Sequence, residues 1–181
     1  LAQVVTSSPI AMWPDIMQGY VRILLEARQY VYLETPYFLP TDPVLFAMRT
    51  AAIAGVDVRL MVPRHSDAKL VEWASTSYIR EAIEAGVKIC FYEDAFNHSK
   101  LLICDDMLCS CGSTNVDFRS FENNFESNIF FYDHDLTMRL KQVFLDDLTH
   151  CTVAETTADL PHTPFYTRLW QASARLLSPL L

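Results

Sequence analysis

Hydrophobic residues recur along the chain with two different spacings, and these spacings predict alternating helices and strands. A spacing of about three to four residues predicts helices at residues 15–28, 42–54 and 69–85. Short runs rich in β-branched and aromatic residues predict strands at residues 3–7, 30–35, 56–62 and 87–92. Gly55 and Gly86 each separate a helix from the next strand, where a left-handed residue commonly ends a helix. These repeated units predict an α/β fold with a central mixed, largely parallel sheet flanked by helices.

The pattern changes in the second half of the chain. Residues 98–105 and 106–113 predict two strands joined by a tight turn. Residues 126–133 predict a further buried strand, and two more helices are expected at residues 134–148 and 164–177. The polar, Thr-rich residues 151–163 predict a surface connection. Because no linker or shift in composition divides the chain, we expect residues 1–181 to form one domain.

Composition and charge narrow the class of protein. The chain is 51% hydrophobic and 20% charged, which excludes a disordered protein. A net charge of −8 argues against a non-specific nucleic-acid binder, so we expect no nucleic-acid partner. No apolar stretch of about 20 residues is present, and we therefore expect this chain to be soluble. Because it starts at Leu1, inside a strand-like run, we expect a piece of a longer protein.

The five cysteines are odd in number and occur mostly in apolar, strand-like runs. We therefore expect reduced residues rather than a disulfide framework, and cytosolic chemistry. Cys109 and Cys111 flank one residue, with His98 nearby, which raises the question of a zinc site. No second pair follows at zinc spacing, so we expect no metal and no other cofactor.

The residues with the greatest chemical interest lie between positions 98 and 126. His98 and Lys100 are two apart, so on a strand their side chains leave the same face. If residues 105–106 form a two-residue turn, the numbers of paired residues sum to 211 and His98 lies opposite Ser113. Asn115 then follows one step further on the same face. This register predicts a patch of imidazole, ammonium, hydroxyl and amide groups.

Asp105 is part of the same string but has a second explanation. It follows Lys100 after four residues and would form the turn that aligns the patch. Aspartate is a favoured turn residue. We therefore include Asp105 among the candidate catalytic residues but expect a structural rather than a chemical role.

The whole string resembles the second motif of the phospholipase D superfamily. It reads H-x-K, four residues, D, six residues, G-S-x-N, then R-S and N-x-E. Further stretches are similar to the C-terminal half of the bacterial cardiolipin synthase family: TPYFLP, AAIAGVDVRLMVP, SDAKLVEWASTSY, EAGVKICFY, GSTNVDFRSFENNFE and LLSPLL. The resemblance covers almost the whole chain and implies a phospholipase D-like sandwich. It departs at Asn123, where an apolar residue is usual, and across residues 151–163.

The side chains of this motif suit metal-free chemistry at a phosphodiester. A neutral imidazole at His98 can attack phosphorus and form a phosphohistidine. Lys100 supplies positive charge, while Ser113 and Asn115 can hydrogen-bond the phosphate oxygens. The attacking ring nitrogen must be unprotonated, so the other should donate to a fixed acceptor, for which Glu126 is the best candidate. The resemblance implies the same roles, with the leaving group protonated by the histidine of a second H-x-K motif.

That second motif is absent from this sequence, because lysine does not stand two residues after any other histidine. The resemblance implies that two homologous halves bring both motifs to one phosphate. We therefore expect the C-terminal catalytic domain of a larger enzyme, without its N-terminal half and membrane segments. Its partner would be that N-terminal half or a second copy of the chain.

The resemblance implies an activity as well as a fold. The expected reaction joins two phosphatidylglycerol molecules into cardiolipin with release of glycerol, at the surface of the bacterial inner membrane. One alternative is a hydrolytic phospholipase D or a phosphodiesterase or nuclease of the same superfamily. An alternative of another class is a non-catalytic half that acts only as a partner.

Two groups of apolar residues have more than one interpretation. Tyr37 and Phe38 lie beyond a strand end, where α/β sheets place their sites, and suit a cleft. Five others suit a membrane-facing patch, although apolar residues at helical spacing more often pack in a core, which we favour: Met12, Trp13, Met17, Trp73 and Tyr78.

Overall fold

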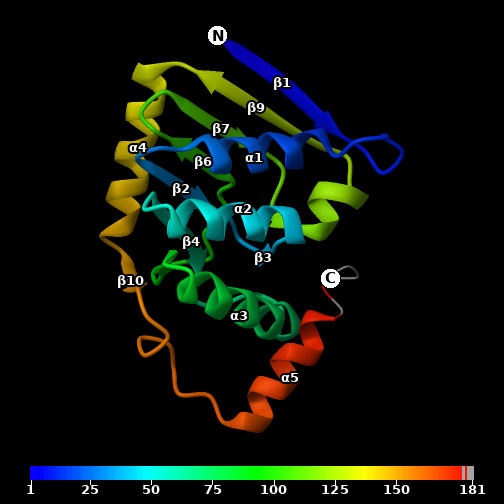
Figure 1. The fold of residues 1–181 in the computed structure, drawn as a ribbon, viewed down its shortest axis with the longest axis vertical. Coiled ribbons are helices and arrows are strands. Elements are labelled where there is room, and N and C mark those ends of the chain that lie inside the picture. The colour runs from blue at the N-terminus through cyan, green and yellow to red at the C-terminus, as the bar shows by residue number, and fades with distance from the viewer. Residues whose placement is uncertain (177, 179–181) are drawn as a thin grey trace.

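The computed structural model describes residues 1–176 and 178, without the side chains of residues 165 and 168. Within these residues an eight-stranded sheet has the order β1-β9-β7-β6-β2-β4-β5-β10 (Figure 1). The strands in this order are Ala2–Ser7, Glu126–Tyr132, Leu108–Gly112, Leu101–Cys104, Tyr30–Glu34, Asp57–Pro63, Lys88–Tyr92 and Cys151–Ala154. The α/β fold class is therefore confirmed.

The direction of the strands differs from the expected one. Within the described sheet only the pairings of β2 with β4 and of β4 with β5 are parallel, and the other neighbouring strands pair antiparallel. The sheet is mixed, as expected, but the prediction that it is largely parallel was wrong. Helical crossovers, which parallel pairs require, join β2, β4 and β5, whereas a tight turn joins β6 to β7.

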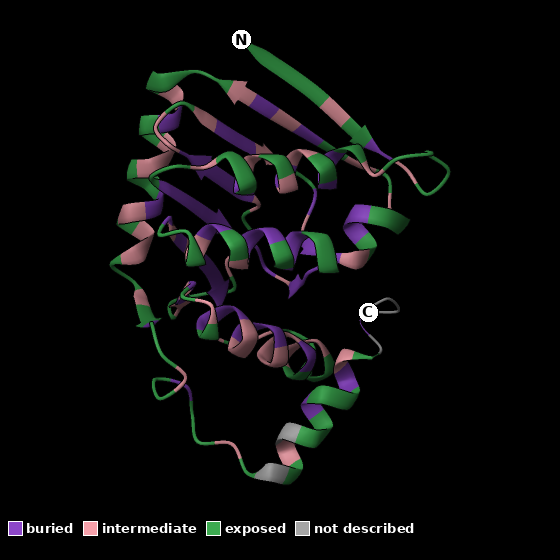
Figure 2. Ribbon diagram, in the orientation of Figure 1, coloured by how far each residue is buried: buried purple, intermediate pink, exposed green. Residues whose placement is uncertain are grey.

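Helices cover both faces of the sheet. The helices α1 (Asp15–Glu26), α2 (Asp42–Ile53) and α3 (Lys69–Glu84) share one hydrophobic core with the sheet. Helix α4 (His134–Leu148) packs on the opposite face, where Phe144 stacks on Tyr32 at 4.8 Å between ring centroids. Figure 2 shows the central strands buried between these layers and β1 exposed at one edge. Helix α5 (Phe165–Arg175) packs against α3, beyond the other edge.

The prediction that Gly55 and Gly86 each end a helix is confirmed. Gly55 and Gly86 have φ values of +93° and +97° and follow the last turns of α2 and α3. A side chain is strained in this left-handed region, which explains why glycine occupies both positions. The helix predicted for residues 164–177 corresponds to α5, and the predicted end at residue 177 lies outside the described residues.

Three elements were not predicted. The start of the supposed surface connection forms β10, an edge strand antiparallel to β5. A second, two-stranded sheet pairs β3 (Phe38–Leu39) with β8 (Val116–Asp117) in parallel. A π-helical turn, Arg119–Asn123, follows β8. Phe38 is fully buried, so its assignment to a cleft was wrong.

The expected core residues divide into two groups. Met17 and Tyr78 are buried, as favoured from the sequence. Met12 and Trp13 are exposed, in the segment before α1, and Trp73 is 42% exposed. The core interpretation therefore holds for the first pair and is wrong for Met12 and Trp13.

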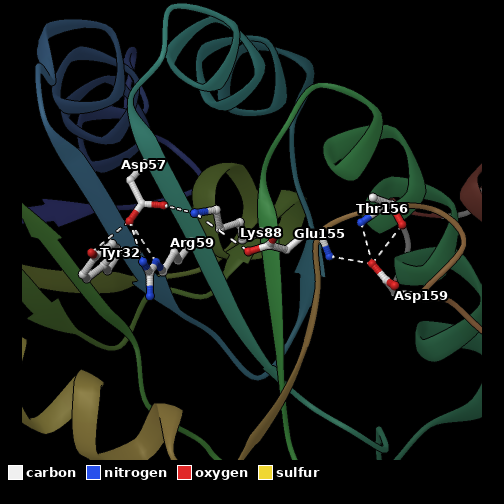
Figure 3. A network of polar contacts seen from close by, with 7 residues as sticks. All are labelled: Tyr32, Asp57, Arg59, Lys88, Glu155, Thr156 and Asp159. Atoms are coloured by element: carbon white, nitrogen blue, oxygen red, sulfur yellow. Dashed lines mark hydrogen bonds and ion pairs between the residues drawn. The ribbon is translucent and has the colours of Figure 1, made fainter.

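An ion-pair network holds the end of the sheet where β4 and β5 begin (Figure 3). Asp57 accepts hydrogen bonds from Tyr32 at 3.0 Å and Arg59 at 2.9 Å, and its carboxylate lies 3.1 Å from the ammonium of Lys88. Burial by itself would raise the pKa of Asp57, but these cationic donors outweigh it and lower the pKa. The network therefore joins three neighbouring strands.

Candidate active site

The candidate residues gather at the end of β2 that lies away from the Asp57 network, where several strand ends meet. His98 and Lys100 lie in the segment that enters β6, Ser113 follows β7, and Glu126 is the first residue of β9. The pairing of Leu101 with the last residue of β2 places the start of β6 beside that end. The structure therefore brings together residues up to 28 positions apart (98 to 126) in the sequence.

The side chains of His98 and Lys100 are in direct contact. The Nζ atom of Lys100 lies 3.1 Å from Nδ1 and 3.4 Å from Nε2 of the His98 ring, and donates to the His98 carbonyl at 2.9 Å. His98 is exposed, whereas Lys100 is half-buried. Burial lowers the pKa of Lys100, while the negative charges of Glu126 and Asp117 act in the opposite direction. The site thus presents an exposed imidazole beside a cation.

Ser113 and Glu126 form a second hydrogen-bonded pair. The Ser113 hydroxyl donates to the Glu126 carboxylate and accepts from the backbone N–H of Ser127 at 3.0 Å. The other carboxylate oxygen of Glu126 accepts from Asn124 at 3.3 Å. These contacts fix the Ser113 hydroxyl at the end of β7.

Gly112 allows the end of β7 to lie close to β9. A Cβ atom on Gly112 would collide with the side-chain oxygen of Asn128 and with the carbonyl of Ser127. Asn128 is fully buried and accepts from the backbone N–H of Thr114 at 3.3 Å. The glycine before the serine therefore lets β7 lie tightly against β9.

Asn115 points a polar atom into the protein. Its Oδ1 atom is buried and has no hydrogen-bond partner in the described structure. Burying an amide oxygen without a partner costs about 1–3 kcal/mol. A buried acceptor next to the site does not itself establish contact with a phosphate, so the binding role of Asn115 stays a prediction.

The predicted strand register was wrong by one residue. Cys104 pairs with Leu108, so paired numbers sum to 212 (104 + 108) rather than 211. The turn holds three residues, because Met107 donates its N–H to the Cys104 carbonyl without joining the ladder. His98 therefore does not lie opposite Ser113 in a ladder, and it reaches the same strand edge from a loop.

Asp105 lies at the other end of β6 from His98. Its carboxylate accepts three backbone N–H groups that lead into β2, those of Arg28 at 2.8 Å and of Gln29 and Tyr30 at 2.9 Å. Asp105 also has a φ of 49°, a left-handed value that aspartate tolerates better than most residues. These contacts favour the structural role that the sequence predicts, and its inclusion among the catalytic residues stays untested.

Among the described residues, no hydrogen bond or ion pair joins Glu126 to His98. The hydrogen bonds to its carboxylate come from Ser113 and Asn124. The role of Glu126 in orienting the His98 ring therefore stays a prediction, and its observed contact is with Ser113.

Glu34 is a polar residue of the site that the sequence did not predict. It is the last residue of β2, is 2% exposed, and has one carboxylate oxygen without a partner in the described structure. The other oxygen lies 3.5 Å from the amide nitrogen of Asn97, and the Asn97 side chain accepts the N–H of Ser99 at 2.8 Å. Burial raises the pKa of Glu34, against the hydrogen bonds from Ser99 and Asn97. The sequence YVYLE gives no signal that would distinguish Glu34 from any other carboxylate at the end of a strand.

Comparison with known proteins identifies the family of this chain. Residues 20–148 match the family model described as cardiolipin synthase, phospholipase D-like domain. This range covers well over half of the chain. The chain belongs to this family.

Curated cardiolipin synthases are similar along nearly the whole chain. A cardiolipin synthase of Clostridium perfringens strain SM101 is 40% identical over 180 residues, which are 99% of this chain and 38% of that protein. Cardiolipin synthase 2 of Bacillus cereus is 43% identical over 180 residues, 99% of this chain and 35% of that protein. The chain therefore spans little more than a third of the length of these cardiolipin synthases.

Solved structures share the fold at low sequence identity. The phospholipase D family member Nuc from Salmonella typhimurium superposes with a TM-score of 0.72 at 16% identity, over 86% of this chain and 99% of that one. A phosphatidylserine synthase from Haemophilus influenzae has a TM-score of 0.76 at 16% identity, over 99% of this chain and 48% of that one. These neighbours confirm the phospholipase D-like fold expected for the cardiolipin synthase family. Among the described residues of this family member, no helix has the length and apolar character to cross a bilayer.

Proposed function

We propose that this chain is the C-terminal catalytic half of a bacterial cardiolipin synthase, and that residues 1–181 form one phospholipase D-like domain. The observation that supports this most is the identity of about 40% to named cardiolipin synthases over 99% of the chain. The shared strand edge of His98, Lys100, Ser113 and Glu126 supports the same proposal. The other half of the protein would bring a second histidine to the same phosphate.

The first step forms a phosphohistidine. A ring nitrogen of His98, or of its counterpart in the other half, attacks the phosphorus of one phosphatidylglycerol. The bond from phosphorus to the glycerol head-group oxygen breaks, and the departing oxygen takes a proton from the second histidine. Lys100 offsets the charge that develops on the non-bridging oxygens, and Ser113 and Asn115 hydrogen-bond them.

The second step transfers the phosphatidyl group. A glycerol hydroxyl of a second phosphatidylglycerol gives its proton to the second histidine and attacks phosphorus. The phosphorus–nitrogen bond breaks, which yields cardiolipin and returns His98 to its neutral form. No metal or cofactor takes part in these two steps. Both lipid substrates lie in a membrane, so the full-length protein would act at the bacterial inner membrane.

One assay distinguishes this function from the alternatives. The polypeptide that carries both halves is incubated with phosphatidylglycerol vesicles, and the lipids are analysed by mass spectrometry. We expect cardiolipin and free glycerol. Phosphatidic acid as the sole product would indicate a hydrolytic phospholipase D, and cleavage of single-stranded DNA in a parallel reaction would indicate a nuclease. Full activity in a protein with Lys100→Met would indicate a non-catalytic partner half.

A further inference from the structure

A cavity of about 390 Å³ lies between the ends of β4 and β5, helix α3 and the segment that leads into α5. Its volume lies in the usual range for small-ligand pockets, about 300–1,000 Å³. Figure 1 shows α3 and α5 packed side by side. None of the proposed catalytic side chains lines the cavity.

The described walls of this cavity combine apolar side chains with two arginines and one glutamate, Glu72, and Arg64 also lies 3.9 Å from the carboxylate of Glu93. Hydrophobic side chains come from several elements: Val62, Val71, Trp73, Ile79, Phe91 and Leu160. Arg64 and Arg80 also line it, and the guanidinium of Arg64 lies over the Phe91 ring at 4.9 Å from its centroid. Such a lining suits the apolar part of an anionic amphiphile.

A row of aromatic rings connects this cavity with the candidate nucleophile. Tyr37 lines the cavity, and its ring centroid lies 5.9 Å from that of Phe96. The Phe96 ring in turn lies 5.9 Å from the His98 ring. The Tyr37 hydroxyl donates to Asp67 at 2.9 Å, which fixes the ring beside the cavity. The cavity is thus two ring contacts away from the site of phosphate chemistry.

The outer side of the same region exposes large apolar side chains. Trp73 lines the cavity and is 42% exposed. On α5, Tyr166, Leu169 and Trp170 are each more than 60% exposed, and their neighbour Thr167 lines the cavity. Exposed Trp and Tyr beside apolar residues are typical of surfaces at a lipid–water interface. An apolar path therefore runs from this surface through the cavity toward His98.

We propose that this cavity receives an acyl chain of the phospholipid whose phosphate is bound at His98. The inference rests on the proposed function, because it assigns part of the same substrate. The lipid would enter from the side of Trp73 and α5, with its glycerol backbone beside Tyr37 and Phe96. Arg64 and Arg80 would attract the anionic lipid to the cavity.

The test fills the cavity and compares lipids with long and short chains. Val71, Ser75 and Ile79 follow one another at helical spacing along the cavity wall of α3. Ser75 has no hydrogen bond from its side chain in the described structure and offers room for a larger residue. Ser75→Phe is assayed in the polypeptide with both halves, on dioleoyl and dihexanoyl phosphatidylglycerol in the same detergent micelles. Val143→Phe, at an exposed position of α4 on the opposite face of the sheet and outside the cavity, is the control.

The Phe side chain at position 75 would take the space in which several methylene groups of the acyl chain are buried. We therefore expect Ser75→Phe to lower kcat/KM for dioleoyl relative to dihexanoyl phosphatidylglycerol by about tenfold or more. Ser75→Asp, which places a charge in the cavity, should shift the same ratio, and Val143→Phe should leave it unchanged. An unchanged ratio in both Ser75 variants would overturn the acyl-chain assignment while leaving phosphatidyl transfer intact. Absence of cardiolipin from both lipids in the unmodified protein would instead overturn the proposed function, and this inference with it.

Discussion

The Nζ atom of Lys100 lies 3.1 Å from Nδ1 of His98. An ammonium group can only donate, so a ring nitrogen that it bonds must carry a free lone pair. A free lone pair is what a nucleophilic imidazole requires. In the proposed mechanism, the H-x-K spacing would provide both the reactive nitrogen and the cation for the phosphate within two residues. When a phosphate arrives, its oxygens can replace the ring nitrogen as acceptors for Lys100.

Asp105 is predicted to act on stability rather than on catalysis. Asp105→Ala would leave the three backbone N–H groups of residues 28–30 without their acceptor. We expect the free energy of unfolding to fall by about 1–3 kcal/mol, with kcat of the folded enzyme nearly unchanged. Urea unfolding and steady-state kinetics of the same preparation check this. Loss of kcat without loss of stability would show that Asp105 has a chemical role.

Glu34 is predicted to position the loop that carries His98. Its carboxyl group contacts Asn97, which in turn holds the N–H of Ser99. Gln keeps an oxygen that can accept from Asn97 and lacks the charge that burial disfavours. We expect Glu34→Ala to lower kcat by about ten- to a hundredfold and Glu34→Gln to restore most of the activity, with KM little changed in both. Equal losses in the two variants would contradict a positioning role.

The ion-pair network around Asp57 is predicted to stabilise the fold in a pH-dependent way. The pKa of Asp57 is lowered in the folded protein, so its contribution is present above the ordinary value of 3.8. It is lost as the pH falls through the lowered folded pKa. At pH 7 we expect Asp57→Asn to reduce the free energy of unfolding by about 1–3 kcal/mol.

Unfolding curves from pH 7 downward check this expectation. The difference between the unmodified protein and Asp57→Asn should shrink once the pH falls below about 4. Arg22→Gln is a suitable control, because its exposed i,i+4 pair with Glu26 is expected to contribute little. A difference that stays constant to low pH would show that Asp57 acts through packing and not through its charge.

The helices and central strands could be predicted because their signals are local. Helical spacing and the positions of Gly55 and Gly86 give the crossovers that join β2, β4 and β5. The direction of the remaining strands depends on tertiary pairing, which apolar runs do not encode. The edge strand β10 was missed because two of its four residues, Thr152 and Val153, are exposed and the segment reads as a polar connection.

The motif predicted which side chains gather in the site, but not how they contact one another. The extra unpaired residue at the turn, Met107, shifts the register by one, and both preceding aspartates adopt left-handed conformations. The hydrogen bond from Ser113 to Glu126, between residues next to the paired strands β7 and β9, is a contact that the motif did not predict. Glu34 escaped prediction because its burial beneath the loop exists only in the folded chain.

In the proposed mechanism, His98 performs covalent chemistry on a phospholipid. The most direct measurement is the cardiolipin produced from phosphatidylglycerol by the two-half polypeptide with His98→Asn, quantified by mass spectrometry. His134→Asn is the matched control, since His134 is exposed on α4 and pairs with Asp135. The account predicts that His98→Asn lowers product formation by at least about a thousandfold with an unchanged unfolding transition, and that His134→Asn stays active. Cardiolipin formation within about twofold of the unmodified protein in His98→Asn would contradict it.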